Sequence, residues 1–393
     1  MSRLWDRGEP LDALVLRFTA GEDHRLDDRL VRHDIRASGA HAAMLHAAGL
    51  LSDADHAALA RALEAIGAAH ARGEWRVALE EEDCHTAIEN RLVEEAGEAG
   101  RRIHLGRSRN DQVLAALRLW LMEELDRLAG EARQVAAALA AIGERRGDLP
   151  MPGYTHMQRA MPTTLGLWAR GYAAEIEDDA AGLAAARRRA DRNPLGSAAG
   201  YGVPVLPIDR DRTTRALGFS ATHEPVTAVQ LSRGKAEATA LFEAALLAQD
   251  LGRLAADLCL FATSEFGFVE IPADLTTGSS MLPQKRNPDL FEIARGRTAE
   301  AVAALHEVLG ISARLPSGYH RDLQLIKKPL FRGIDSAGDT ARLLAHALPR
   351  LGWNADRMRA AIDPSLGAVE RACRLARDEG IPFRDAFRRV REE

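Results

Sequence analysis

Residues 113–142 read VLAALRLWLMEELDRLAGEARQVAAALAAI, and this stretch decides the fold. Its apolar residues recur at spacings of three and four over about eight turns, as on one face of an amphipathic helix. They are Val113, Leu117, Leu121, Leu125, Leu128, Ala132, Val135, Leu139 and Ile142. A helix of this length needs neighbours of similar length to bury its apolar face. The stretch therefore predicts a bundle of long helices.

The rest of the chain offers such neighbours. Apolar residues make up 46% of the 393 residues and aromatic residues only 5%, with alanine and leucine prominent, which favours helix. Further long helices are predicted, the first beginning with Pro162 in its first turn. Their approximate ranges are 162–192, 228–264, 289–315 and 328–348. No stretch alternates between apolar and polar residues as a strand would, so the predicted fold class is all-α.

Smaller helical domains are expected on both sides of the bundle. The predicted domains are residues 1–106, the bundle at 107–355, and a short C-terminal domain at 356–393. In the first domain, Ser52 is positioned to cap a helix over residues 53–71, with Asp53 and Asp55 in its first turn.

Charge and cysteine usage exclude several classes of function. The net charge of −5 gives no electrostatic reason to expect a nucleic-acid or membrane partner. The three cysteines, Cys84, Cys259 and Cys373, are widely spaced and form no metal-binding pattern, so no metal and no disulfide are expected. With no secretory signal and no membrane span recognisable, the expected location is the cytoplasm.

Three polar loops interrupt the helices, at residues 106–111, 153–159 and 278–288. The third reads GSSMLPQKRNP and concentrates hydroxyl, amide and cationic groups. Such a loop between rigid helices suits an anionic substrate, although it could also be a solvated basic turn. The first two loops lie at opposite ends of a helix roughly 50 Å long. If both serve one site, that site combines different subunits, which predicts a homo-oligomer.

The groups in these loops fit the handling of carboxylates. The donors are Arg107, Arg109, Asn110, Thr155, Lys285 and Asn287. His156 can exchange a proton near neutral pH. Ser279 becomes a base only where cations and a helix N-terminus favour its alkoxide. Each of these residues taken alone could instead be a surface ion pair, a structural histidine or a turn serine; it is their joint occurrence that indicates a site.

Several stretches resemble a known family. Residues 278–288 resemble the signature loop of the fumarase/aspartase superfamily. GRSRNDQV at 106–113 and GYTHMQRA at 153–160 are similar to the argininosuccinate lyase family within it. EDCHTAIE at 82–89 and YHRDLQ at 319–324 add weaker matches. The resemblance extends over nearly the whole chain.

The resemblance implies a long-helix bundle of the fumarase/aspartase type and a homotetramer whose active sites are shared by three subunits. It implies the reversible β-elimination of argininosuccinate to L-arginine and fumarate, the final step of arginine biosynthesis, without a cofactor. Two alternatives stay open: a related lyase that releases fumarate from another N-substituted aspartate, and a non-catalytic structural homologue.

The same resemblance assigns roles to residues. Ser279 would remove the proton next to a carboxylate, and Lys285, Asn287 and Thr155 would stabilise the resulting dianion. His156, held by Glu292, would help to protonate the departing guanidino nitrogen. The residues implied to hold the substrate are Asp83, Arg109, Asn110, Tyr319, Gln324 and Lys327.

Three stretches depart from the family pattern. Residues 18–23 lack the serine that is usual there and carry Gly21 near that position. Residues 193–202 contain an unusual Gly-Tyr-Gly, and Gly234 stands where an aspartate is common. These departures bear on the specificity for the leaving group more than on the elimination itself.

Overall fold

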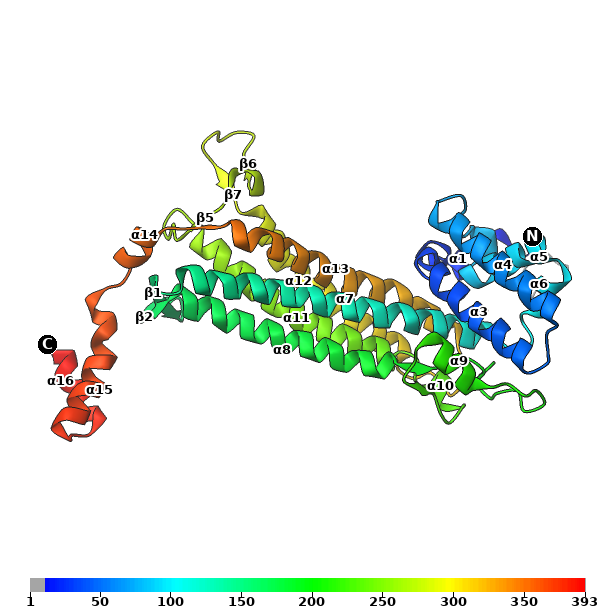
Figure 1. The fold of residues 1–393 in the computed structure, drawn as a ribbon. Helices are drawn as coiled ribbons and strands as arrows, with labels where there is room; N and C mark the ends of the chain where they lie inside the picture. Colours follow the sequence, from blue (N-terminus) through cyan, green and yellow to red (C-terminus); the bar gives the residue numbers. More distant parts are fainter. Residues whose placement is uncertain (1–10, 393) are drawn as a thin grey trace. The chain divides into compact units, whose positions relative to one another are not determined.

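The structure is a computed structural model and describes residues 11–392. Helices dominate it and the strands are short, so the predicted all-α fold class is confirmed (Figure 1). Five long helices form its framework. They are α7 (Arg109–Arg146), α8 (Leu165–Ala190), α11 (Lys235–Phe261), α12 (Asp289–Ser312) and α13 (Lys327–Ala347).

The chain divides into two compact units made of discontinuous segments. Unit 1 comprises Met1–Arg127, Gly182–Ala244 and Glu300–Asp335, and unit 2 comprises Leu128–Ala181, Ala245–Ala299 and Ser336–Glu393. Each of the five long helices contributes a part to both units. The predicted division into consecutive domains ending at residues 106 and 355 stays a prediction.

Unit 1 adds short helices and one parallel strand pair to its parts of the long helices. The helices are α1 (Ala13–Ala20), α2 (Asp23–Leu26), η1 (Asp27–Arg29), α3 (Val31–Ala47), α4 (Asp53–Ala71), η2 (Leu79–Glu81), α5 (Cys84–Ala96), α6 (Glu98–Arg102), α9 (Arg210–Leu217), α10 (Ala228–Leu231) and η4 (Arg321–Ile326). The strands are β3 (Arg192–Asn193) and β4 (Ala221–Thr222).

Unit 2 adds three antiparallel strand pairs and the C-terminal helices. The strand pairs are β1 (Pro150–Thr155) with β2 (Gln158–Thr164), β5 (Val269–Glu270) with β8 (Gly352–Trp353), and β6 (Thr277–Gly278) with β7 (Arg286–Asn287). The helices are η3 (Ala273–Leu275), η5 (Leu348–Arg350), α14 (Ala355–Ala360), η6 (Pro364–Gly367), α15 (Ala368–Glu379) and α16 (Phe383–Glu392).

The apolar face predicted for residues 113–142 is the buried face of α7. Its members from Leu117 to Ile142 are buried, and only Val113, near the N-terminus of the helix, is partly exposed. The helix has 38 residues and is therefore about 57 Å long. The predicted cap of α4 is confirmed as well, because the Ser52 hydroxyl accepts a hydrogen bond from the Asp55 backbone N–H at 3.1 Å.

Two local predictions were wrong. Pro162 lies in strand β2 and not in the first turn of a helix, which begins at Leu165. The β1–β2 hairpin was missed because most of β2 is exposed, so its residues do not alternate between apolar and polar. The helix predicted over 228–264 is divided into α10 and α11 around Gly234, whose φ of 82° is incompatible with a continuous right-handed helix.

Small residues allow the long helices to approach closely within unit 1. A Cβ placed on Gly333 of α13 would lie 2.4 Å from Leu241 Cδ2 on α11 and 2.9 Å from Ala304 Cβ on α12. Leu241 and Ala304 are fully buried. Neither neighbour has space to move into, because protein interiors are close-packed. Gly333 therefore marks the point where three helices meet.

We expect Gly333→Ala to lower the free energy of unfolding by about 1–3 kcal/mol, since the added methyl group forces the helices apart. The measurement is urea unfolding followed by circular dichroism. Gly39→Ala on α3 is the matched control, because a Cβ there lies within 4 Å of no atom of residues 11–392. That control should be neutral or stabilising by up to about 1 kcal/mol. Equal stability of the two variants would contradict the close approach.

The C-terminal helices pack on one another. Ala372 of α15 and Ala386 and Val390 of α16 form a small buried cluster. Among residues 11–392, none of the helices combines the length and the apolar character that a bilayer span needs.

Candidate active site

A cavity of about 160 Å³ in unit 1 gathers the six residues implied to hold the substrate, whereas Thr155 and Asn287, implied to stabilise the dianion, do not line it. These six are Asp83, Arg109, Asn110, Tyr319, Gln324 and Lys327. They come from three regions far apart in the sequence: the start of α5, the start of α7, and the segment from Tyr319 through η4 to the first residue of α13. The other lining residues are Asp23, His85, Val113, Arg233 and Arg321.

Asp83 and Arg109 hold each other in this cavity. Asp83 is the N-cap of α5, and its Oδ1 accepts a hydrogen bond from the Thr86 backbone N–H at 2.9 Å. Its Oδ2 accepts a hydrogen bond from Arg109 Nη2, at the first residue of α7. Burial alone would raise the pKa of Asp83, but the positive charges of His85 and Arg109 lower it to about 2. The carboxylate is therefore ionised at neutral pH.

Lys327 is a buried cation at the start of α13. Its ammonium group donates to Asp23 Oδ2 at 2.7 Å and to Asp27 Oδ1 at 2.5 Å. Although burial opposes the charge, the two carboxylates raise the pKa of Lys327 above its usual range. Burial, opposed by Lys327 but assisted by Asp27, raises the pKa of Asp23 to about 7. These bonds attach α2 and η1 to α13.

Residues of η4 close another side of the cavity. Gln324 Nε2 donates to the Thr19 carbonyl at 2.9 Å, and Arg321 Nη2 donates to the same carbonyl at 3.2 Å. Arg321 also forms an ion pair of 3.1 Å with the buried Glu82. The C-terminal end of α1, part of the stretch 18–23 that departs from the family pattern, is thus held against the cavity.

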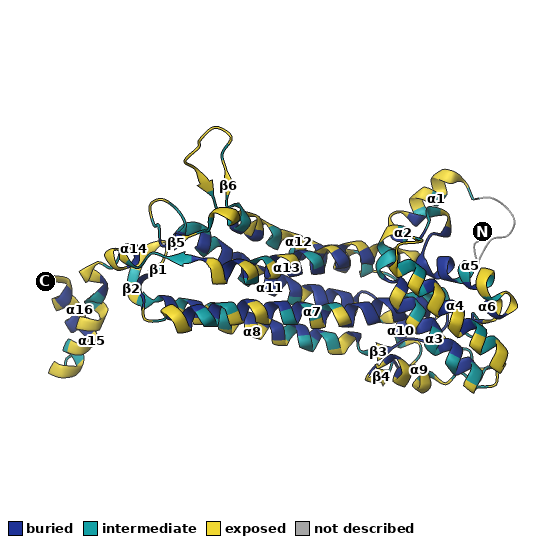
Figure 2. Ribbon diagram, turned by 45° about the horizontal axis from the view of Figure 1, so that its top comes forward, coloured by how far each residue is buried: buried dark blue, intermediate teal, exposed yellow. Residues whose placement is uncertain are grey.

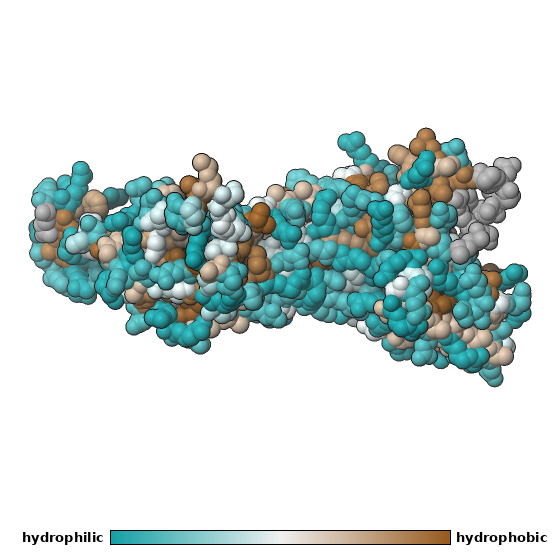
Figure 3. Space-filling model, turned by 90° about the horizontal axis from the view of Figure 1, so that it is seen from above, coloured by the Kyte–Doolittle hydropathy of each residue, from teal (hydrophilic) through white to brown (hydrophobic). Residues whose placement is uncertain are grey.

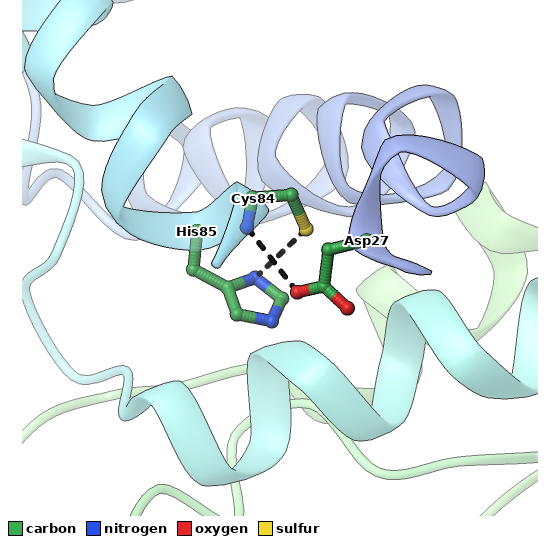
Figure 4. A group of neighbouring side chains, drawn as sticks. All are labelled: Asp27, Cys84 and His85. Carbon is green, nitrogen blue, oxygen red and sulfur yellow. Dashed lines mark hydrogen bonds between the residues drawn. The ribbon is translucent and has the colours of Figure 1, made fainter. Parts of the chain in front are cut away.

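Asp27, Cys84 and His85 form a buried group whose ligand atoms lie within 4.8 Å of one another (Figure 4). The donor types would suit a transition metal. All three donors already have partners: Asp27 binds the Lys327 ammonium, His85 Nδ1 is 2.6 Å from Asp34 Oδ2, and Cys84 Sγ is 3.8 Å from the same oxygen. A metal ion would have to displace or adjoin that ammonium, so the donor set fits a resident metal poorly.

The His85–Asp34 pair is charged. Burial disfavours the imidazolium, but the nearby Asp34 carboxylate raises the pKa of His85. His85 in turn lowers the pKa of Asp34 against the effect of burial, with help from Arg107 and from the hydrogen bonds of Gln112. The cavity is therefore lined by ionised groups of both signs, a lining suited to a zwitterionic ligand.

The loop predicted to carry the base lies in unit 2. It connects β6 to β7 and is largely exposed (Figure 2). Ser279 Oγ accepts hydrogen bonds from the backbone N–H groups of Met281 at 3.2 Å and Leu282 at 3.0 Å. Two donors aimed at this oxygen favour its ionised form. Lys285 and Asn287 are on the same loop and strand, with Lys285 exposed.

His156 lies at the tip of the β1–β2 hairpin, also in unit 2. His156 and Met157 form its two-residue turn, with φ values of 52° and 62°. Positive φ at both central residues is typical of type I′ hairpin turns but strained for residues other than glycine, and such strain is concentrated at functional sites. Thr155 and His156 are exposed. Within the described chain, His156 forms no hydrogen bond with Glu292, an exposed residue in the first turn of α12.

The structure therefore brings one group of predicted residues together and leaves the other in loops of unit 2. Within unit 1, four charged residues of the cavity were not singled out from the sequence: Asp23, His85, Arg233 and Arg321. Each lies in or beside a stretch that was compared with the family pattern. A charged residue that is buried in such a stretch would indicate a site, but a single sequence does not show which charged residues are buried.

The loop at 106–111 is fixed by buried contacts. Asp111 Oδ2 accepts hydrogen bonds from the backbone N–H groups of Gly196 at 2.9 Å and Ala198 at 2.8 Å. His41 Nε2 lies 3.0 Å from the Leu105 carbonyl. Burial, assisted by the charge of Arg107, lowers the pKa of His41 to about 3. His41 is thus neutral in the folded chain at any pH above about 3.

We expect the free energy of unfolding to fall as the pH drops from about 6.5 towards 3. Over this range, His41 binds a proton only in the unfolded chain. This lowers the free energy of unfolding by about 1.4 kcal/mol for each unit by which the pH falls. His33 and His223, whose pKa values are also about 3, add to the slope. His41→Gln should reduce the slope by about one proton in urea unfolding at pH 6, 5 and 4. The exposed His306 provides the control His306→Gln, and an unchanged slope in His41→Gln would contradict the prediction.

Comparison with known proteins identifies the family. Residues 7–303 match the family model described as "Lyase". The chain is 47% identical over 391 residues to argininosuccinate lyase of Sorangium cellulosum, covering 100% of this chain and 90% of that protein. It is 45% identical over 386 residues to argininosuccinate lyase of Stenotrophomonas maltophilia, covering 98% of this chain and 89% of that protein. The chain belongs to the argininosuccinate lyase family.

Solved structures of other lyases share the fold. EDDS lyase in complex with formate superposes with a TM-score of 0.81 at 24% identity, covering 97% of this chain and 76% of that one. A class II fumarase from Schistosoma mansoni gives a TM-score of 0.81 at 16% identity, covering 96% of this chain and 91% of the fumarase chain. These likenesses show a shared fold, whereas the sequence places this chain among the argininosuccinate lyases.

Proposed function

We propose that the chain catalyses the reversible elimination of argininosuccinate to L-arginine and fumarate, the final step of arginine biosynthesis, without a cofactor. The observation that carries the proposal is the cavity of unit 1, in which the six residues that the resemblance implies to hold the substrate lie together. The identity of 43–47% to argininosuccinate lyases over nearly the whole chain supports the same substrate.

The reaction begins with the removal of a carbon-bound proton next to a carboxylate of the succinyl group. Ser279 Oγ is the base in this proposal. Its two backbone N–H donors stabilise negative charge on the oxygen, which an isolated serine hydroxyl cannot hold near neutral pH. The Lys285 ammonium in the same loop adds a positive charge.

Proton removal leaves a dianion in which the adjacent carboxylate carries the new charge. Donors held in place before the reaction lower its energy without reorganisation. Lys285 and Asn287 supply them in this proposal, together with Thr155 from the β1–β2 hairpin. The carbon–nitrogen bond then breaks, its electron pair passes to the guanidino nitrogen, and fumarate forms.

The departing guanidino group needs a proton. His156 helps to supply it in this proposal, and Glu292 holds the imidazole once the two side chains meet in the assembled enzyme. The turn that carries His156 is short and paired on both sides by strand hydrogen bonds, so the imidazole is presented from a fixed backbone.

The predicted catalytic residues are solvated in a single chain, which is unsuited to this chemistry. Thr155, His156, Lys285 and Glu292 are exposed, and water weakens every electrostatic contact that they could make. Arg109 begins a helix about 57 Å long, and His156 follows its C-terminal end. We therefore propose that loops of other protomers complete each cavity in a homotetramer.

Exposed apolar side chains on the long helices support such an assembly. Phe242 and Leu246 of α11 and Ile293 and Leu309 of α12 are between 38% and 61% exposed. Hydrophobic residues interrupt the mostly hydrophilic surface of the face drawn in Figure 3. Apolar helix faces without a cover are typical of subunit interfaces.

The cytoplasmic location expected from the sequence belongs to the same proposal. Cys84, Cys259 and Cys373 are free thiols, and Cys373 is exposed. Thiols of this kind are stable in a reducing compartment.

We expect the purified protein to release fumarate from argininosuccinate, detected by ultraviolet absorbance, and Ser279→Ala to lose about a thousandfold in kcat while keeping its fold. The matched control is Ser264→Ala, an exposed serine elsewhere in unit 2. The protein should also prefer argininosuccinate to other N-substituted aspartates by at least about tenfold in kcat/KM. No release at high enzyme concentration would reject the function, and normal turnover by Ser279→Ala would reject the base.

Complementation tests the shared site. Arg109→Ala and His156→Ala should each be nearly inactive alone. When the two variants are denatured together and reassembled, about a quarter of the sites should recover both residues, because each protomer supplies the residue that the other lacks. The measurement is fumarate release after reassembly. Mixed oligomers without recovered activity would show that Arg109 and His156 serve one site from the same protomer.

A further inference from the structure

In the part of the chain that the structure describes, one cation of the unit 1 cavity has no carboxylate partner. Arg109 is paired with Asp83, Lys327 with Asp23 and Asp27, and Arg321 with Glu82. Arg233 lines the same cavity, yet among residues 11–392 its guanidinium forms no ion pair and no hydrogen bond. Its Nε and Nη1 are buried without a partner, and the residue is only 6% exposed.

The local backbone explains why no side chain next to Arg233 in the sequence neutralises it. Gly234 has a φ of 82°, and a Cβ on it would lie 2.6 Å from Ser312 Cβ. A carboxylate cannot be introduced at this position without moving α12. The ring centroid of Tyr319 is 5.8 Å from the Arg233 guanidinium carbon. Arg233 is thus held beside a predicted substrate-binding residue and faces the cavity.

A buried charge without a partner is costly to the folded state. A guanidinium cannot lose its proton to avoid the cost, and replacing its water shell requires hydrogen-bond acceptors in a fixed arrangement. The other cations of the cavity meet this need with carboxylates of the chain. An anionic ligand is the remaining source of acceptors for Arg233, and a carboxylate matches the guanidinium with two parallel hydrogen bonds.

We propose that Arg233 binds the α-carboxylate of the arginine moiety of the substrate and thereby selects an amino acid as the leaving group. This inference rests on the proposed function. The chemistry attributed to the unit 2 loops concerns the succinyl part of the substrate, whereas the α-carboxylate belongs to the leaving group. Asp23 and Asp83 line the same cavity, and acidic and cationic groups together suit the ammonium and carboxylate of an amino acid.

The test compares L-arginine with agmatine, which is the same molecule without the carboxylate. Binding of each is measured by calorimetry to the wild type, Arg233→Gln, Arg233→Lys and the surface control Arg101→Gln. We expect Arg233→Gln to weaken L-arginine binding by about tenfold or more and to leave agmatine binding unchanged within about twofold. Arg233→Lys should recover part of the affinity, because it keeps the charge but not the two-pronged geometry.

Kinetics separates this inference from the proposed function. Arg233→Gln should raise the KM for argininosuccinate about tenfold and change kcat by less than about threefold, since the α-carboxylate is remote from the breaking bond. A wild type that releases no fumarate would reject the proposed function, while the calorimetric comparison would still decide on Arg233. Equal loss of L-arginine and agmatine binding, or no loss of either, would overturn the assignment.

Stability measurements exclude a merely structural role. Because Arg233→Gln removes an unpaired buried charge, its Tm should equal or exceed that of the wild type, and its oligomeric state in sedimentation should be unchanged. Lower affinity together with unchanged or higher stability would support the ligand role. A lower Tm or a dissociated oligomer would show that Arg233 pairs with another part of the assembly, and the inference would fail.

Discussion

Charge neutralisation in the buried part of unit 1 is the constraint on which the candidate site depends. Lys327, His85 and Arg109 are each held by a carboxylate from a distant part of the sequence. Breaking one such pair leaves the other charge buried and alone, at a cost of about 3–5 kcal/mol. The ion pairs thus fix where α2, α5, α7 and α13 begin relative to one another, and the cavity lies among these helix starts.

The loops attributed to catalysis follow a different principle. Ser279 and His156 are positioned by short-range backbone geometry: a serine turn with two N–H donors and a two-residue hairpin turn. Neither arrangement needs a buried core, so both residues can remain exposed in a single chain. Rigid local geometry of this kind is what a residue needs if it completes a site belonging to another protomer.

Periodic and local features could be predicted from the sequence, whereas pairings between distant residues could not. The apolar face of α7 and the Ser52 cap depend on spacing and neighbours alone, and both are as predicted. The β1–β2 hairpin was missed because its exposed strand shows no alternation. Arg233 could not be predicted as a site residue, because its importance depends on its burial and on the lack of a neighbouring carboxylate among residues 11–392. The assigned catalytic roles, which rest on resemblance, remain predictions.

The sharing of α7, α8, α11, α12 and α13 between both compact units restricts how such a protein can evolve. Neither unit corresponds to an uninterrupted gene segment, so neither can be inherited, duplicated or exchanged as a module. A new activity or specificity must instead arise from the replacement of individual side chains or from changes in the loops, while the long helices stay the same. The fold that this chain shares with a class II fumarase at 16% identity agrees with such a restriction.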